Sequence, residues 1–280
     1  MPPPGNRVHR GLVAGAALLA VFALAAVLAP VLAPHDPLAV VDASTPVALQ
    51  PPSARHPLGT DALGRDILAR VLFGGRVSLA VGVGVELVVA VLGCAIGLLA
   101  GYYGGALDAT LMRVTDVVMA FPSLVLAIGL IAVFEAPGLA NVFVVLILLG
   151  WTTIARVVRG TVLTLKSLEY VQAARALGVR DRTILVRHIL PNALGPLLVA
   201  ATLGVGGNMV AEAGLSFLGL GSQPPTISWG AMLADGQSDL MTAPWAAVFP
   251  GLALLLAVLG VNLVGDGLRD LLDPRTGGGE

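Results

Sequence analysis

One charged segment interrupts an otherwise apolar chain and holds many of the side chains that could do chemistry. It reads EYVQAARALGVRDRTILVRHILPNALGP (169–196) and contains Arg175, Arg180, Arg182 and Arg187. Guanidinium groups bind carboxylates and phosphates, whereas catalysis by proton transfer or nucleophilic attack needs paired groups such as His with Asp, Ser or Cys. The segment lacks such a constellation, so it predicts contact with another molecule rather than catalysis.

The remaining reactive side chains do not suggest an enzyme or a metal site. The single cysteine, Cys94, lies in an apolar run, so no internal disulfide is expected. The only lysine, Lys166, lies in TVLTLKSLEY, so the G-x-x-x-x-G-K-[ST] phosphate loop is absent. The histidines show no spacing suited to a metal ion; they are His9, His35, His56 and His188.

The composition indicates an integral membrane protein. Of the 280 residues, 56% are hydrophobic and 12% are charged, about half the charged fraction of a typical soluble domain. The net charge of −1 argues against a nucleic-acid-binding protein.

The apolar stretches predict an all-α polytopic protein with about six transmembrane helices, because a span needs about 20 apolar residues. The first stretch follows Arg7 and Arg10 and could be a cleaved signal peptide, but its length favours a retained anchor helix. The six stretches are 11–33, 77–100, 116–134, 139–158, 193–215 and 245–265.

The distribution of Lys and Arg predicts that both termini are cytoplasmic. With that orientation the inner loops and ends carry 12 of these residues, including those of the charged segment, and the outer loops carry 4. The expected organisation is an anchor helix with an outer loop over 1–75, a membrane domain over 76–266 and a cytoplasmic tail over 267–280.

Two outer loops, 34–76 and 216–244, are long enough to contact a partner. In the first, we expect Asp61 to cap a short helix lying on the membrane surface, with Asp66 paired to Arg70. In the second, the tryptophans are expected at the membrane interface, and the acids could contact a partner or a cationic substrate or simply be solvated. These residues are Trp229, Trp245, Asp235 and Asp239.

The charged segment itself predicts two short helices joined by a glycine turn. Tyr170, Ala173, Ala174 and Leu177 form an apolar stripe at helical spacing, and Gly178 follows it. Asp181 is expected to cap a second helix that ends at Pro191. A solvated loop, a helix on the lipid surface and a docking element are all open interpretations. The small alanines and the glycine turn favour docking.

Several residues inside the predicted spans also need an explanation. Glu86, Glu212 and Asn208 either line a pathway, with the last two near the amine of a peptide, or hydrogen-bond neighbouring helices. Gly93, Gly97 and Gly101 predict close helix packing, within the chain or between subunits. Pro122 indicates a kink or a helix boundary.

The charged segment resembles the EAA loop of ABC-importer permeases, in which EAA is followed after three residues by Gly and then, nine residues later, by I-x-L-P. Here Gln172 replaces the Glu, Ala173 and Ala174 match, Gly178 has the right spacing, and His188 replaces the Ile before Leu190-Pro191. The Gln172 departure excludes a salt bridge at that position, although Glu169 supplies a carboxylate nearby. Other stretches resemble the second permease subunit of dipeptide, oligopeptide and nickel importers: HPLGTDALGRDILARVLFGGRVSL, AEAGLSFLGLGSQPPTISWGAML and VGDGLRDLLDPR.

The resemblance implies a type I importer permease fold and a non-catalytic subunit in a bacterial inner membrane. Its implied partners are a second homologous permease, two ATPases that carry the ATP and Mg²⁺, an extracytoplasmic binding protein and the lipid bilayer, but no nucleic acid. The implied coupling loop spans about 165–191. Its implied coupling residues are Glu169, Tyr170, Gln172, Ala173, Ala174, Arg175, Leu177, Gly178, Arg180, Asp181 and Arg182, and contact with the binding protein would involve Trp229, Asp235 and Asp239.

The sequence leaves the substrate class and two rival functions open. The most favoured substrates are di- or oligopeptides, with nickel or another small solute as the alternative for the same permease class. An ion-coupled secondary transporter would use Glu86 or Glu212 as its ion site, but no internal repeat is visible. An intramembrane hydrolase would need a pair of catalytic side chains in the spans, and none is obvious.

Overall fold

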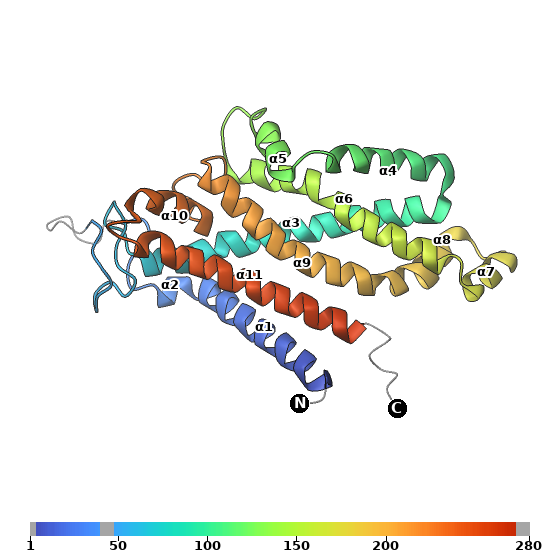
Figure 1. The fold of residues 1–280 in the computed structure, drawn as a ribbon, viewed down its shortest axis with the longest axis horizontal. Helices are drawn as coiled ribbons and strands as arrows, with labels where there is room; N and C mark the ends of the chain where they lie inside the picture. Colours follow the sequence, from blue (N-terminus) through green and yellow to red (C-terminus); the bar gives the residue numbers. More distant parts are fainter. Residues whose placement is uncertain (1–3, 40–47, 273–280) are drawn as a thin grey trace.

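In a computed structural model, which describes residues 4–39 and 48–272, the chain is a bundle of long helices (Figure 1). Five helical segments are long and apolar enough to cross a membrane, and a bent pair, α4 with α5, brings the number to six. The α-helices are α1 (Pro4–Val27), α2 (Ala29–Leu32), α3 (Ile67–Tyr103), α4 (Gly105–Met119), α5 (Ser123–Ile131), α6 (Leu139–Leu165), α7 (Glu169–Ala176), α8 (Asp181–Ile184), α9 (Leu190–Phe217), α10 (Trp229–Gly236) and α11 (Trp245–Leu272). A π-helical turn, η1 (Leu185–Ile189), joins α8 to α9, and a 3₁₀ turn, η2 (Gln237–Asp239), follows α10.

The predicted span over 116–134 is broken. Helices α4 and α5 meet at an angle of 88°, and Pro122 occupies the N-cap of α5. Because proline has no amide hydrogen and disfavours helix in the residue before it, the chain turns at this point, as Pro122 led us to expect. Arg159 of α6 pairs with Asp108 of α4 at 2.5 Å, so the first half of the broken span is tied to the bundle.

The helix expected on the membrane surface is instead the start of α3. Asp66, not Asp61, is the N-cap residue, and its side chain accepts a hydrogen bond from the Ala69 amide at 2.8 Å. Asp66 does not pair with Arg70, whose guanidinium contacts Asp61 and Asp235. A single capped helix therefore runs from the predicted outer loop into the predicted span, and the expected domain boundary at residue 76 lies inside it.

Glycines allow α3 and α6 to pack closely. A Cβ atom added at Gly93, Gly97 or Gly101 would lie within 2.6–2.7 Å of Ile154, Ala155 or Val162 respectively. Such distances are far below van der Waals contact, so larger residues would push the two helices apart. The glycine stripe is therefore a packing seam within the chain, one of the two interpretations that its spacing allowed.

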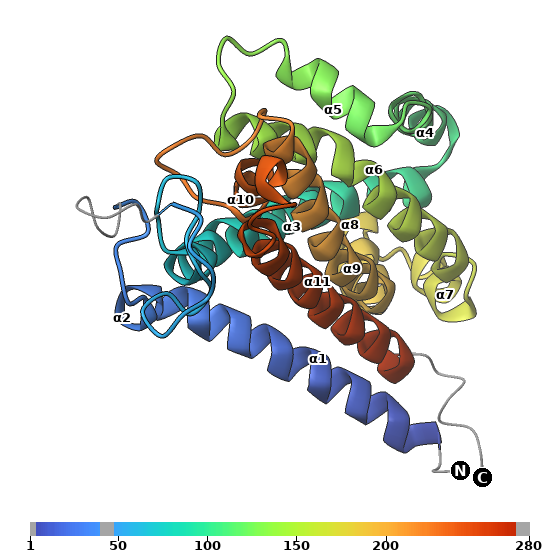
Figure 2. The same ribbon diagram turned by 60° about the vertical axis from the view of Figure 1, so that its left-hand side comes forward.

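The start of α1 and the end of α11 lie at the same end of the bundle (Figure 2). These helices are antiparallel, because positions 12 and 15 of α1 meet positions 267 and 260 of α11. The end of α11 also approaches the start of α9, where Leu272 lies near Gly195. The start of α1, the end of α11, α7 and α8 therefore lie at one end of the bundle. Helices α2 and α10 lie at the opposite end (Figure 1). The predicted tail begins within α11, and its residues 273–280 lie outside the described part of the chain.

Candidate functional site

A helical hairpin projects from one end of the bundle and corresponds to the charged segment of the sequence (Figure 1). Helix α7 ends in a turn in which the Gly178 amide donates to the Arg175 carbonyl and the Val179 amide donates to the Ala174 carbonyl. Gly178 has a φ of +75°, a conformation that glycine adopts without strain. The predicted helix, glycine turn and second helix are therefore all present.

Polar contacts fix this hairpin to the end of α3. The Tyr102 hydroxyl donates to Asp181 at 2.6 Å, and the Arg175 guanidinium lies 5.0 Å from the centre of the Tyr102 ring. The contact with Tyr102 raises the pKa of Arg175 above its ordinary value, so this side chain stays charged. Asp181 does not cap α8 as expected, because the N-cap is Arg180. Tyr102 was not predicted, since its partner is 79 residues away in the sequence.

The second helix does not end at Pro191. The π-helical turn Leu185–Ile189 leads directly into α9, where Pro191 occupies the first turn. A proline at this point removes one backbone hydrogen bond of the continuous helix, and the irregular π-helical turn lies directly before it. The hairpin is thus continuous with a membrane-spanning helix, and a displacement of α7 and α8 would act directly on α9.

The apolar stripe of α7 is divided between the bundle and the solvent. Ala174 is only 9% exposed and packs with Val171 in the main hydrophobic core, so the expectation that it belongs to a docking surface is wrong. Helix α7 packs against its own bundle through Val171 and Ala174, so this edge of the stripe is not free for a partner. Tyr170 is 44% exposed, Leu177 is 84% exposed, and Ala173 is also exposed.

The other predicted coupling residues surround this stripe. Glu169, Arg180 and Arg182 are exposed, and the Gln172 amide donates to the Lys166 carbonyl at 3.2 Å. The Lys166 ammonium donates to the Gly101 carbonyl at 2.7 Å, near the C-terminus of α3. The only lysine of the chain therefore stabilises a helix end.

A cavity of about 940 Å³ lies between the broken span and helices α3, α6 and α9. Glu86 and Asn208 line it together with apolar side chains, and the Asn208 amide donates to Glu86 Oε2 at 2.9 Å. Glu86 Oε1 is buried without a hydrogen-bond partner among the described residues. The cavity is therefore lined mainly by apolar side chains and has one acidic hydrogen-bond acceptor, Glu86.

Glu212 has one of the two placements that its sequence context allowed, whereas Trp229 is placed differently from what we expected. Glu212 is 0% exposed, does not line the cavity, and accepts hydrogen bonds from Ser216 and Ser78 at 2.7 and 3.4 Å. Trp229 is also buried, and its indole nitrogen donates to the Val71 carbonyl at 2.9 Å. Glu212 therefore joins helices, and Trp229 neither marks the membrane interface nor reaches a partner.

An ion-pair network closes the opposite end of the bundle. Asp235 is half exposed and lies 3.2 Å from Arg65 and 3.0 Å from Arg70, and Asp61 pairs with Arg65 at 2.7 Å. Asp239 is half-buried on the neighbouring turn. The two acids predicted to contact a partner are therefore on the surface, although Asp235 already binds two guanidinium groups.

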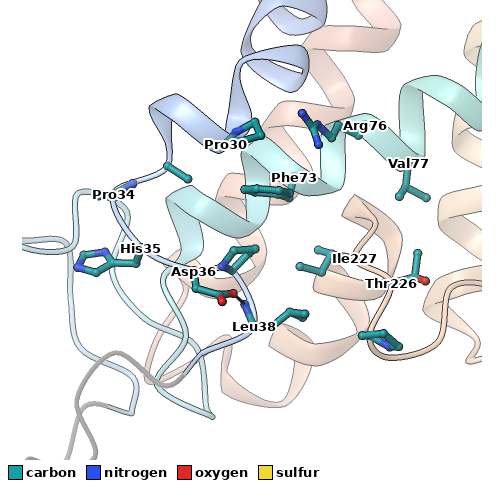
Figure 3. A pocket seen from close by; sticks show the side chains of 13 residues that line it. Pro30, Pro34, His35, Asp36, Leu38, Phe73, Arg76, Val77, Thr226 and Ile227 are labelled. Carbon is teal, nitrogen blue, oxygen red and sulfur yellow. Dashed lines mark hydrogen bonds between the residues drawn. The ribbon is translucent and has the colours of Figure 1, made fainter.

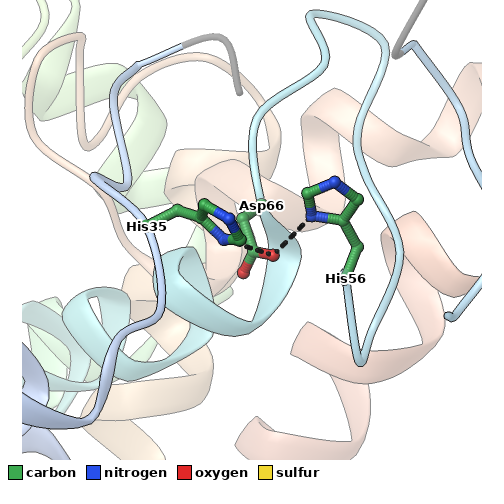
Figure 4. Close-up of side chains that lie close together, drawn as sticks. All are labelled: His35, His56 and Asp66. Carbon is green, nitrogen blue, oxygen red and sulfur yellow. Dashed lines mark hydrogen bonds and ion pairs between the residues drawn. The ribbon is translucent and has the colours of Figure 1, made fainter. Parts of the chain in front are cut away.

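The same end brings together two of the histidines that the sequence separates. His35 and His56 flank the carboxylate of Asp66 (Figure 4), with Nδ1 to Oδ2 distances of 3.4 and 3.1 Å. The spacing of the histidines along the chain predicted no metal site, but the fold brings this pair together with a carboxylate. Their separations along the chain fit no metal-binding motif, so only the fold of the loops reveals the cluster.

Comparisons with known proteins agree with this arrangement. Residues 93–278 match the model of the binding-protein-dependent transport system inner membrane component family, and residues 7–52 match the N-terminal transmembrane domain of oligopeptide transport permease C. The chain is 49% identical over 224 residues to the glutathione transport system permease protein GsiD of Pectobacterium atrosepticum, covering 80% of this chain and 74% of that protein. It is 41% identical over 263 residues to the dipeptide transport system permease protein DppC of Alkalihalophilus pseudofirmus, covering 94% and 85%.

A solved structure has the same fold. The inward-facing MetNI methionine ABC transporter aligns with a TM-score of 0.61 at 19% identity, over 72% of this chain and 96% of the other. The type I importer fold expected from the sequence is therefore confirmed. The family also decides against an ion-coupled secondary transporter. The chain belongs to the binding-protein-dependent transport system inner membrane components, as an ABC-importer permease of the dipeptide, oligopeptide and nickel branch.

Proposed function

We propose that this chain forms half of the translocation pathway of an ATP-driven peptide importer in a bacterial inner membrane. A second homologous permease would supply the other half, two ATPases would bind the cytoplasmic face, and an extracytoplasmic binding protein would deliver the peptide. The chain itself would be non-catalytic, with ATP and Mg²⁺ held by the ATPases.

The observation that carries this proposal is the α7 hairpin, which is fixed to the bundle yet leaves apolar side chains uncovered. Tyr170, Ala173 and Leu177 are exposed beyond the Tyr102–Asp181 contact. An apolar helix face with a small residue at its centre fits a groove in a partner protein. Because α8 continues into α9, movement of the partner would reach the membrane helices without a flexible linker.

The cavity lined by Glu86 and Asn208 supports the pathway half of the proposal. It is bounded on this chain by α3, α5, α6 and α9, and a second permease would complete its wall. The uncommitted Glu86 oxygen could accept a hydrogen bond from the terminal ammonium group of a peptide. The peptide class of the substrate is supported by the relatives named for dipeptides and glutathione.

Co-purification with candidate ATPases tests the docking surface. We expect wild-type chain to retain two ATPase subunits and Ala173→Glu to retain at least about tenfold less, because the carboxylate would be buried in an apolar contact. Gln172→Glu is the matched control. It adds the same group one residue away, at the position where related coupling loops carry Glu, and should retain the ATPases.

Membrane insertion of each variant is checked by its yield and monodispersity after extraction. If wild-type chain retains no ATPase, or if Ala173→Glu and Gln172→Glu retain equal amounts, the proposed docking surface is incorrect.

A further inference from the structure

The cluster of His35, His56 and Asp66 has the donor set of a metal site. Imidazole nitrogens with a carboxylate oxygen suit zinc and related divalent transition ions. One potential ligand atom from each residue lies within 4.8 Å of the other two. We propose that these three side chains bind a divalent transition-metal ion such as Zn²⁺ on the outer end of the bundle.

Two of the three separations between candidate ligand atoms fit a tetrahedral site, and all three are within 4.8 Å. With metal–ligand bonds of about 2.0–2.1 Å, neighbouring ligand atoms of a tetrahedron lie roughly 3.3 Å apart. The Asp66 oxygen lies 3.1 Å from His56 Nδ1 and 3.4 Å from His35 Nδ1. His35 and His56 lie on either side of the carboxylate (Figure 4), so an ion bound by all three groups would require the side chains to rotate toward it. Water would fill the fourth position.

The surroundings hold the ligands in place. Asp66 Oδ1 is committed to the Ala69 amide at 2.8 Å, which leaves Oδ2 for an ion and orients the carboxylate. The backbone of His56 is held on both sides, since its amide donates to Ser53 Oγ at 3.1 Å and its carbonyl accepts from the Gly59 amide at 2.9 Å. The side chains of Asp66 and His56 are 0% and 1% exposed.

One feature of the cluster points to a missing ligand. His35 Nδ1 is buried and makes no hydrogen bond within the described residues, although it faces the carboxylate. A buried polar atom without a partner is costly, and a metal ion would satisfy it. A single cation could bind the Asp66 oxygen and both imidazoles together.

An ion could reach the site from the outer surface. The His35 side chain is 26% exposed and lines a pocket of about 720 Å³ between Phe73, Arg76 and the loop at Thr226–Ile227 (Figure 3). Since His35 follows α2 whereas Asp66 begins α3, the ion would connect the N-terminal helices to the outer end of the membrane domain. That connection would add to the Arg76 hydrogen bonds to the Ala26 and Val27 carbonyls.

Metal binding by the full-length chain tests this proposal. The protein is purified in lipid nanodiscs with a tag that lacks histidine, stripped with a chelator and titrated with ZnCl₂ against a chromophoric competitor. We expect one Zn²⁺ per chain and at least about tenfold weaker binding in His35→Gln, His56→Gln and Asp66→Asn. The Asn variant can still cap α3, so its loss would not reflect a failure to form that helix.

His188→Gln, the same substitution on the other end of the bundle, serves as the control and should bind as wild type does. A zinc-dependent rise in the melting temperature of wild type but not of His56→Gln would agree with the result. If wild type binds no more zinc than Asp66→Asn, the three side chains form a hydrogen-bonded group only and the proposal is overturned. ATPase docking is unaffected by that outcome.

Discussion

At the scale of single residues, two buried glutamates in the membrane-spanning helices have different surroundings. Glu86 lines the cavity and has an oxygen without a hydrogen-bond partner among the described residues, whereas Glu212 is enclosed by Ser78 and Ser216. Both are isolated acids in apolar runs, so the sequence could not separate their roles. Of the two, only Glu86 lines the cavity that we propose as part of the pathway.

A pair of isosteric substitutions distinguishes these roles. We expect Glu86→Gln to lower peptide uptake by about tenfold with little change in melting temperature, because the amide oxygen can still accept from Asn208 but carries no charge for an ammonium group. Glu212→Gln should leave uptake within about twofold of wild type. Uptake by the purified importer and thermal unfolding of the same samples are the measurements. Loss of uptake in Glu212→Gln alone would contradict the assignment.

At the scale of elements, the α7 hairpin must move with the bundle if it is to transmit force. The contact between Tyr102 and Asp181 joins the end of α3 to the start of α8, and Val171 and Ala174 pack into the core beside it. A flexible tether would lack such contacts. The hairpin is therefore built as a rigid extension of the bundle.

Removing one hydroxyl tests this rigidity. Tyr102→Phe removes the hydrogen bond to Asp181 but keeps the ring under Arg175. We expect the hairpin to lose about 1 kcal/mol of local stability, which would raise the rate of amide hydrogen exchange across residues 169–184 about fivefold. Tyr103→Phe is the matched control, since Tyr103 is exposed and its hydroxyl makes no hydrogen bond within the described residues. Equal exchange in both variants would show that the Tyr102 hydroxyl does not hold the hairpin.

At the scale of the whole molecule, apolar length and charge distribution were sufficient to predict the helical spans and the hairpin. They were not sufficient for boundaries set by local contacts. Asp66 starts α3 ten residues before the predicted span, and the π-helical turn after Ile184 fuses the hairpin with α9. The failed site predictions share a cause. Trp229 and Ala174 were judged from their own segments, but their burial depends on helices distant in sequence.

Contacts across the whole chain explain what the sequence alone could not reveal. Asp235 meets Arg65 and Arg70 from more than 160 residues away, and Tyr102 meets Asp181 across 79 residues. A long-range pair of this kind leaves no periodic pattern in a single sequence. The orientation of the molecule in the membrane stays a prediction. The hairpin, the start of α1 and the end of α11 lie on one side of the bundle, in agreement with the charge distribution (Figure 2).

Peptide uptake into proteoliposomes tests the central claim most directly. The chain is reconstituted with its second permease, ATPases and binding protein, and uptake is compared for wild type, Ala173→Glu and Gln172→Glu with ATP on the ATPase side. We predict ATP-dependent uptake by wild type and Gln172→Glu and at least about a tenfold loss in Ala173→Glu. Uptake that persists without ATPases, or that is equal in all three proteins, would contradict the account.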